Sequence, residues 1–171
     1  FPEGGGQAGD TGYLGDVEVF DTHEKNGVIY HETEAPVAVG TEVKGELDYK
    51  ERFSRMQQHT GEHMLSGIIH RLYGYDNVGF HLGAAETTMD FNGEQVREVE
   101  KLANQAVWDN IPVEILYPTK EELASMDYRS KIEIEGQVRI VRIGDVDMCA
   151  CCAPHVSRTG EVGIIKVISC D

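Results

Sequence analysis

The residue types best suited to chemistry in this chain form two pairs that lie far apart in the sequence. His59 and His63 are four residues apart, and so are Cys151 and His155. Residues four apart on a helix lie one above the other on one face, so two imidazoles placed in this way can hold one metal ion. Together the pairs supply three imidazoles and a thiolate, a ligand set that suits tetrahedral zinc. The sequence therefore predicts one zinc ion per chain, bound by His59, His63, Cys151 and His155.

The chain has three further cysteines, Cys149, Cys152 and Cys170. They fall outside the spacing that puts Cys151 four residues before His155, so we do not expect them to bind the metal. Three of the four cysteines lie within four residues of one another, which is too close for the disulfide framework of a secreted protein. The cysteine pattern therefore favours a reduced, cytoplasmic protein.

The first pair requires a helix, and the second requires a turn. Apolar residues recur at roughly helical spacing from Met56 to Leu72, which predicts a helix from about Tyr49 to Gly74 with Ser54 as a candidate N-cap. Pro154 favours a loop around the second pair. A metal shared by the two pairs would join this helix to that loop.

The elements on either side predict an α+β fold in two domains. Short strand-like runs with a strong Asn26-Gly27 hairpin turn predict a small antiparallel β-barrel in residues 1–49. Residues 50–171 add the metal helix and then alternate strands with helices, which predicts an antiparallel sheet with helices packed on one face. The elements expected there are a hairpin over 78–82 and 86–91, helices over 94–110 and 119–126, and strands over 113–117, 137–143 and 163–169.

The net charge of −15, from 30 acidic and 15 basic residues, restricts the partners. Broad binding of phosphate needs positive charge, so a polynucleotide partner would have to be held by a local patch or by another domain. Two small clusters could serve, or could be ordinary solvated residues: Lys50, Arg52 and Arg55, and Arg139, Arg142 and Arg158. No apolar run approaches the length of a membrane span, so we expect no membrane partner.

The glycine-rich start of the chain, from Pro2 to Gly12, cannot form a helix or a regular strand. It is either a loop whose backbone approaches something closely or a flexible tail. This stretch resembles the glycine-rich motif of the editing domains of alanyl-tRNA synthetases and of their free-standing relatives, the AlaX proteins. His59 to His63 resembles the His-x-x-x-His motif of that family, Cys151 to His155 its Cys-x-x-x-His motif, and Thr159 to Gly163 fits the segment that follows.

The resemblance covers essentially the whole chain and implies a β-barrel followed by an editing domain shared with threonyl-tRNA synthetase. It implies hydrolysis of mischarged tRNA(Ala) at the zinc site, chiefly of seryl-tRNA, with glycyl-tRNA as a second candidate substrate. The partner that it implies is the 3′ end and acceptor stem of the tRNA. It also implies a further C-terminal domain that binds tRNA or dimerises. The candidate substrate-binding residues are Thr60, Gly4, Gly5, Gly6 and Gln7. Thr60 could contact a seryl hydroxyl or simply bond to its own helix.

Two other functions fit parts of the pattern. His59 to His63 also reads as the inverted metallopeptidase motif His-x-x-Glu-His, with Glu62 as general base and Glu133 or Glu135 as a third ligand. That reading leaves Cys151 and His155 without a role. The second is a zinc-stapled module that only binds tRNA or a protein, because four protein ligands normally mark a structural zinc site.

Overall fold

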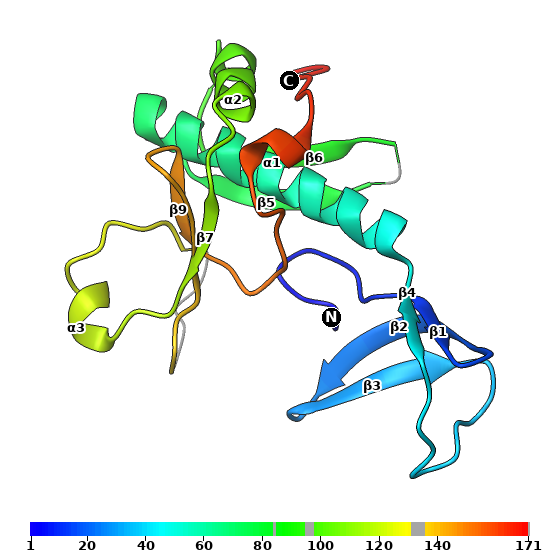
Figure 1. The fold of residues 1–171 in the computed structure, drawn as a ribbon. Helices are drawn as coiled ribbons and strands as arrows, with labels where there is room; N and C mark the ends of the chain where they lie inside the picture. Colours follow the sequence, from blue (N-terminus) through cyan, green and yellow to red (C-terminus); the bar gives the residue numbers. More distant parts are fainter. Residues whose placement is uncertain (84, 95–97, 131–135, 171) are drawn as a thin grey trace. The chain divides into compact units, whose positions relative to one another are not determined.

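The computed structural model describes residues 1–83, 85–94, 98–130 and 136–170 of the chain. The chain divides into two compact units, Phe1–Arg55 and Met56–Asp171, and each is described by itself (Figure 1). Helix α1, Tyr49–Tyr73, begins in the first unit and ends in the second. The predicted α+β class is confirmed, because both units contain antiparallel sheet and α1 is accompanied by further helices.

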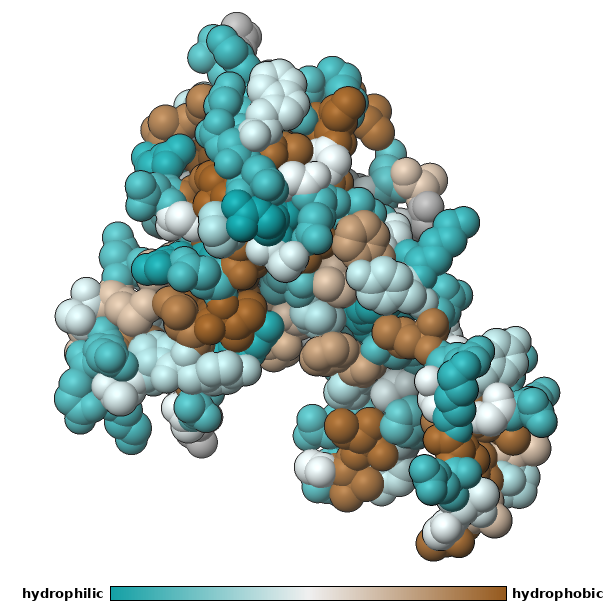
Figure 2. Space-filling model, viewed as in Figure 1, coloured by the Kyte–Doolittle hydropathy of each residue, from teal (hydrophilic) through white to brown (hydrophobic). Residues whose placement is uncertain are grey.

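The first unit is built on one four-stranded sheet in the order β3-β2-β1-β4, with every pair antiparallel. The strands are β1 Gly12–Leu14, β2 Val17–Lys25, β3 Val28–Thr33 and β4 Gly45–Leu47. The predicted hairpin turn joins β2 to β3, with positive φ angles of 55° at Asn26 and 75° at Gly27. Closure of this sheet into a barrel stays a prediction. Hydrophobic residues are visible on the surface of this unit (Figure 2), and Phe20, Val28 and Tyr30 are among its exposed apolar side chains.

The glycine-rich stretch is ordered by a tight turn. Gly4 and Gln7 exchange two backbone hydrogen bonds of 3.0 and 3.1 Å, and Gly5 and Gly6 between them have φ angles of 60° and 83°. Two consecutive positive φ angles are a conformation that glycine adopts without strain. The stretch is therefore a defined turn, which favours the loop interpretation over the flexible tail.

A buried arginine holds this turn to the start of α1 within the first unit. Arg52 is 3% exposed, and its guanidinium donates to the carboxylate of Asp10, to Oε1 of Gln7 and to the carbonyl of Ala8. Hydrogen bonds between a charged donor and a carboxylate are among the stronger ones in proteins. One member of the predicted basic cluster is thus buried and engaged in structure, while Lys50 is exposed.

Helix α1 begins as the apolar spacing predicts, but its first turn is capped by a different residue. The Asp48 carboxylate accepts a hydrogen bond of 3.2 Å from the backbone N–H of Glu51. Asp48 thus satisfies an N–H that has no partner within the helix. Ser54 lies inside the helix, so its assignment as the N-cap was wrong.

The strands of the second unit form two sheets among the described residues, where the sequence suggested one. β5 Asn77–Leu82 pairs with β6 Thr87–Phe91, as the predicted hairpin requires. β7 Val113–Leu116, β8 Ile140–Ile143 and β9 Asp147–Ala150 form the other sheet in the order β7-β8-β9. β9 was not predicted, and it is the strand that leads into the second ligand pair.

The core of the second unit lies where α1 and α2, Val99–Trp108, pack on each other and on strands of both sheets. From α1 come Met64, Leu65, Ile68 and Ile69, and from α2 come Val99, Ala103, Ala106 and Val107. Met64 and Ile143 of β8 are both fully buried. The 3.6-residue periodicity that predicted the helices is the periodicity with which they bury side chains. Packing of the helices on one face of a sheet stays a prediction.

Two predicted elements differ in the structure. The second predicted helix is α2, which is shorter than 94–110, and residues 95–97 lie outside the described residues. The helix predicted over 119–126 is the short α3, Lys120–Leu123, capped by Thr119. None of the helices among the described residues has the length and apolar character needed to span a bilayer.

The strand predicted over 163–169 is absent among the described residues. The backbone of this segment pairs with side chains of α2 instead of with a strand. Asn104 accepts from the N–H of Ile165 and donates to its carbonyl, at 2.9 and 2.7 Å, and Glu100 accepts from the N–H of Val167 at 2.8 Å. The alternation of Ile and Val in this segment therefore does not correspond to a strand that is paired with another strand.

Candidate metal centre

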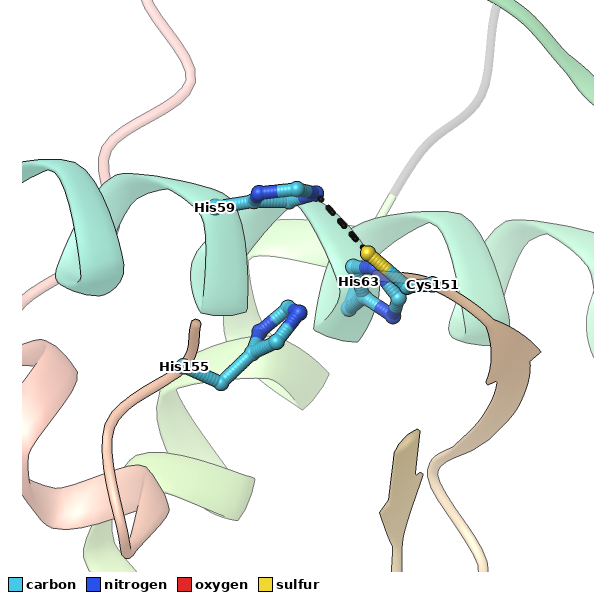
Figure 3. Close-up of side chains that lie close together, drawn as sticks. All are labelled: His59, His63, Cys151 and His155. Carbon is cyan, nitrogen blue, oxygen red and sulfur yellow. Dashed lines mark hydrogen bonds between the residues drawn. The ribbon is translucent and has the colours of Figure 1, made fainter. Parts of the chain in front are cut away.

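The four predicted ligands come together in the second unit (Figure 3). His59 and His63 project from one face of α1, while Cys151 and His155 come from the loop after β9. One ligand atom from each residue can be chosen so that all four lie within 4.8 Å of one another. Cys151 Sγ lies 3.8 Å from Nε2 of His59, and the centroids of the His63 and His155 rings are 4.6 Å apart. This buried group could hold one metal ion.

The protonation chemistry of His155 fits a metal. His155 is 9% exposed, and its Nε2 is a buried nitrogen for which the described residues offer no hydrogen-bond partner. A buried polar atom without a partner is costly, so an unpaired Nε2 inside a cluster of donor groups indicates that a metal ion is its partner. Burial, followed by the charges of His63, His59 and Arg139, lowers the pKa of His155 well below its ordinary value. A neutral imidazole is the form that binds metal.

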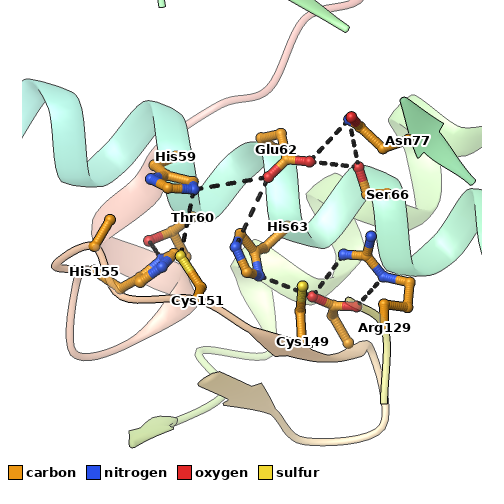
Figure 4. A network of polar contacts seen from close by, with 12 residues as sticks. His59, Thr60, Glu62, His63, Ser66, Asn77, Arg129, Cys149, Cys151 and His155 are labelled. Carbon is orange, nitrogen blue, oxygen red and sulfur yellow. Dashed lines mark hydrogen bonds and ion pairs between the residues drawn. The ribbon is translucent and has the colours of Figure 1, made fainter. Parts of the chain in front are cut away.

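Two of the three imidazoles, those of His155 and His63, are oriented by a polar contact at Nδ1 (Figure 4). His155 Nδ1 lies 3.1 Å from Thr60 Oγ1, which also accepts from the backbone N–H of Val156 at 3.3 Å. His63 Nδ1 lies 2.9 Å from Oδ2 of Asp147. In both cases the Nε2 atom is left for the centre of the group.

Asp147 is itself held by an arginine. Its side chain is 1% exposed, and the guanidinium of Arg129 donates to both of its oxygens, at 2.8 and 3.0 Å. Burial raises the pKa of Asp147, but hydrogen bonds from His63 and Arg129 outweigh burial and leave this pKa below its ordinary value. Burial lowers the pKa of His63, but Asp147, Cys151 and Glu62 together bring it well above its ordinary value. An anionic Asp147 therefore sits between two cationic or potentially cationic groups.

A second buried carboxylate, Glu62, lies on the other side of the histidine pair. Its Oε1 accepts from Ser66 at 2.7 Å and from Asn77 at 2.9 Å. Its Oε2 lies 4.0 Å from Nε2 of His59 and 3.8 Å from Nε2 of His63, beyond hydrogen-bond range. Glu62 also lines a cavity of about 650 Å³ between α1, β6 and residues 162–170. Glu62 therefore lines this cavity and also lies within 4.0 Å of both imidazoles of the histidine pair.

The loop that carries Cys151 and His155 is fixed by backbone contacts from a basic side chain. Arg139 donates to the carbonyls of Cys151, at 2.5 Å, and Ala153, at 3.0 Å. The segment after His155 forms the 3-10 helix η1, Thr159–Val162. Thr159 is fully buried and donates to the carbonyl of Ala106 on α2 at 2.6 Å. Arg139 thus contributes to the architecture of the loop.

One glycine lets α1 approach β9 closely. Gly67 lies one helical turn after His63, and a Cβ atom built on it would lie 2.3 Å from the carbonyl oxygen of Val146 and 2.6 Å from Cβ of Asp147. Real Cβ atoms essentially never approach backbone so closely, so only glycine fits there without movement. This contact sets the distance between α1 and Asp147.

Two residues that support the metal centre, Asp147 and Arg129, were not predicted from the sequence. Asp147 and Arg129 are distant from His63 in the sequence, and neither belongs to a motif. A signal for Asp147 does exist, because Asp147 and Cys149 alternate along β9 and so share a face, and Cys151 follows two residues after Cys149. Cys149 on that face is buried, and burial raises the pKa of its thiol. The set His63, Asp147 and Cys149 could also hold an ion, which makes Cys149 the rival thiol ligand.

The predicted substrate-binding residues fall in different surroundings. Thr60 is fully buried beside His155. Gly5 and Gly6 are exposed in the turn, while Gln7 is 2% exposed and accepts from Arg52. Glu133 and Glu135, offered as third ligands of a metallopeptidase, lie outside the described residues. Contact of any of these residues with a substrate stays a prediction.

Comparison with known proteins agrees with the motifs. Residues 138–171, which contain Cys151 and His155, match the second additional domain of threonyl and alanyl tRNA synthetases. Over 98% of its length the chain is 39% identical to the alanyl-tRNA editing protein AlaX-L of Pyrococcus horikoshii. The chain is a homologue of the AlaX-type alanyl-tRNA editing proteins.

Two further relatives match the chain over nearly its whole length. The chain is 33% identical to the alanyl-tRNA editing protein Aarsd1-B of Xenopus laevis and 34% identical to an alanine–tRNA ligase of Halorubrum lacusprofundi, in each case over 98% of its own length. It covers 45% of AlaX-L, 43% of Aarsd1-B and 20% of the ligase. The chain thus spans less than half the length of each of these relatives.

Proposed function

We propose that this chain is a trans-editing hydrolase that deacylates mischarged tRNA(Ala), with seryl-tRNA and then glycyl-tRNA as substrates. The observation that carries the proposal is the convergence of His59, His63, Cys151 and His155 in a homologue of alanyl-tRNA editing proteins. The four residues would hold one zinc ion, because three imidazoles and a thiolate match the preference of that metal. When bound, zinc supplies Lewis-acid polarisation of an ester carbonyl.

The residues around the site have separate tasks in this proposal. Thr60 and Asp147 orient the imidazoles of His155 and His63. Oγ1 of Thr60 contacts Nδ1 of His155 and also accepts from the N–H of Val156, so both of its lone pairs are used when His155 donates. Thr60 could then contact a seryl hydroxyl only by donating its own hydroxyl proton. In the turn Gly4-Gly5-Gly6-Gln7, the exposed Gly5 and Gly6 would offer backbone amides to the tRNA 3′ end or acceptor stem, while Gly4 and Gln7 hold the turn closed.

The proposal extends to the organisation and setting of the whole protein. Residues 1–49 would form a barrel domain and residues 50–171 the editing domain. In a longer chain, a further domain that binds tRNA or dimerises would compensate for the net charge of −15 by raising the local concentration of tRNA at the site. We also propose a cytoplasmic setting, since four cysteines that form no disulfide suit a reducing compartment.

A deacylation assay with seryl-, glycyl- and alanyl-tRNA(Ala) tests the function. We expect hydrolysis of the seryl ester with a high KM, sparing of the alanyl ester, and activity that falls as salt rises. Removing zinc with a chelator should abolish the activity, and adding zinc should restore it. Full activity in a protein shown to be free of metal would contradict the proposal.

A non-catalytic module is the second candidate, because four protein ligands fill a tetrahedral shell and such zinc sites are usually structural. The same assay separates the two. If saturating seryl-tRNA(Ala) is bound but not hydrolysed, the binding module replaces the enzyme. The metallopeptidase interpretation is disfavoured, because Cys151 and His155 join the histidine pair of its motif in one group.

A further inference from the structure

The imidazole of His63 contacts the carboxylate of Asp147 through Nδ1. Its Nδ1 lies 2.9 Å from Oδ2 of Asp147, and both side chains are almost completely buried. A carboxylate oxygen only accepts, so Nδ1 carries the hydrogen of this contact, and in the neutral ring, the form that binds metal, Nε2 then carries the lone pair. In this tautomer the lone pair of Nε2 is free to coordinate the ion held by the four residues.

Asp147 is in turn held in place by Arg129. The guanidinium donates to Oδ1 at 2.8 Å through Nε and to Oδ2 at 3.0 Å through Nη2, a two-pronged contact that fixes the plane of the carboxylate. The backbone of Arg129 also bonds to β9: its N–H donates to Met148 at 2.8 Å, and its carbonyl accepts from Ala150 at 2.9 Å. Both the base and the tip of the arginine are therefore anchored to the strand that carries Asp147.

We propose that Asp147, fixed by Arg129, is a positioning residue that sets the tautomer and ring orientation of His63 and thereby the affinity of the site for metal. The inference rests on the metal centre of the proposed function. It deepens that proposal, because it assigns a task to two residues that belong to none of the motifs. Partners of this kind on metal-binding histidines commonly contribute 10- to 100-fold to metal affinity.

A purely structural ion pair would have a different signature. Removing one partner of such a pair leaves a buried charge and lowers the stability of the fold, but it does not change the affinity of a folded site for metal. The distribution of contacts favours the positioning role, since Oδ2 of Asp147 is shared by His63 and Arg129, whereas Oδ1 contacts Arg129. The test must therefore measure affinity on folded protein.

The experiment measures zinc affinity by competition with a chelator of known affinity, together with the visible absorption spectrum of the cobalt-loaded protein. Asp147→Leu, which removes the acceptor, should weaken zinc binding about 10- to 100-fold. Asp147→Asn keeps an oxygen that can accept from Nδ1, so it should retain a larger share of the affinity. Arg129→Gln leaves Asp147 intact but free to rotate, so it should show a smaller loss and an altered cobalt spectrum. It also serves as the second variant should Asp147→Leu fail to fold.

The matched control is Arg142→Gln. Arg142 pairs with Glu114 at 2.6 and 2.9 Å across β8 and β7, in the same sheet as Asp147, but the pair is partly exposed and touches no ligand. Its zinc affinity should equal that of the wild type.

The outcomes separate this inference from the proposed function. Weakened zinc binding in folded Asp147→Leu or Arg129→Gln supports the inference even if the wild type deacylates no tRNA. Unchanged affinity and an unchanged cobalt spectrum in both folded variants overturn it, although the editing activity could still stand. A wild-type chain that binds no zinc overturns both.

Discussion

Replacing Cys151 by serine should remove the thiolate from the metal centre and weaken zinc binding about 10²- to 10³-fold. In a tetrahedral site with zinc–sulfur and zinc–nitrogen distances of about 2.3 and 2.05 Å, the sulfur and a nitrogen lie about 3.6 Å apart. Cys151 Sγ and His59 Nε2 are 3.8 Å apart in the structure. The observed separation is therefore within about 0.2 Å of the separation expected for two ligands of one tetrahedral zinc ion.

The magnitude follows from sharing the binding free energy among four ligands. Structural zinc sites bind with about 10 to 16 kcal/mol, so an equal share is about 2.5 to 4 kcal/mol per ligand. Because each 1.4 kcal/mol is a factor of ten, this share corresponds to about two to three orders of magnitude. Serine keeps a weak oxygen donor, so the loss should fall toward the lower end.

The assay is zinc competition, with the sulfur-to-metal charge-transfer absorption of the cobalt-loaded protein as a direct report on the thiolate. Cys152→Ser is the control, because Cys152 is an exposed neighbour whose loss should leave both readings unchanged. Cys149→Ser tests the rival group of His63, Asp147 and Cys149. If Cys149→Ser abolishes the charge-transfer band while Cys151→Ser keeps it, the assignment of the ligands is wrong.

Four other changes test the rest of the structure. Thr60→Val should lower the unfolding free energy by about 1 to 3 kcal/mol and also weaken metal binding, because it leaves His155 and the Val156 N–H without their acceptor. An unchanged melting temperature together with an unchanged zinc titration would contradict this prediction. Met64→Ala should cost about 2 to 5 kcal/mol in denaturant unfolding, since Met64 is fully buried, and a loss below 1 kcal/mol would contradict the packing. Gly5→Asn should preserve the turn, because asparagine tolerates a positive φ angle, whereas Gly5→Val should strain it. Comparing the deacylation rates of the two variants separates the effect of backbone strain from that of blocked contact with tRNA. Equal rates for both variants and the wild type would mean that the turn has no part in catalysis. His63 and Arg129 lower the pKa of Asp147 in the folded state despite its burial, so the stability that its carboxylate contributes is present above about pH 4 and is lost as the pH falls further. In thermal melts below about pH 4, the wild type should therefore lose stability more steeply than Asp147→Asn. Parallel plots of melting temperature against pH for the two proteins would refute this.

The parts of the fold that the sequence predicted well are those with a local signal. Helix α1, the Asn26-Gly27 hairpin and the β5–β6 hairpin follow from periodicity and turn residues within a few positions. The α+β class and the four candidate ligands follow in the same way, because spacing alone places each pair.

The parts that were missed depend on partners remote in sequence. β9 is short and mixes polar with apolar residues, so its existence depends on pairing with β8. Residues 163–169 have the pattern of a strand, but Asn104 and Glu100 of α2 supply their hydrogen bonds. The alternation along β9 was a signal for Asp147, but its contacts with Arg129 and His63 were not predicted, because the helix that carries His63 meets β9 only in the folded chain.

The close approach at Gly67 has a consequence for how this helix can change. Glycine inside a helix costs about 1 kcal/mol relative to alanine, so propensity alone would favour replacement by alanine at this position. In this structure the added methyl group would meet the Val146 carbonyl and push Asp147 away from His63. A mutation that strengthens the isolated helix would therefore loosen the metal centre, and selection for thermal stability and selection for metal retention would act on Gly67 in opposite directions.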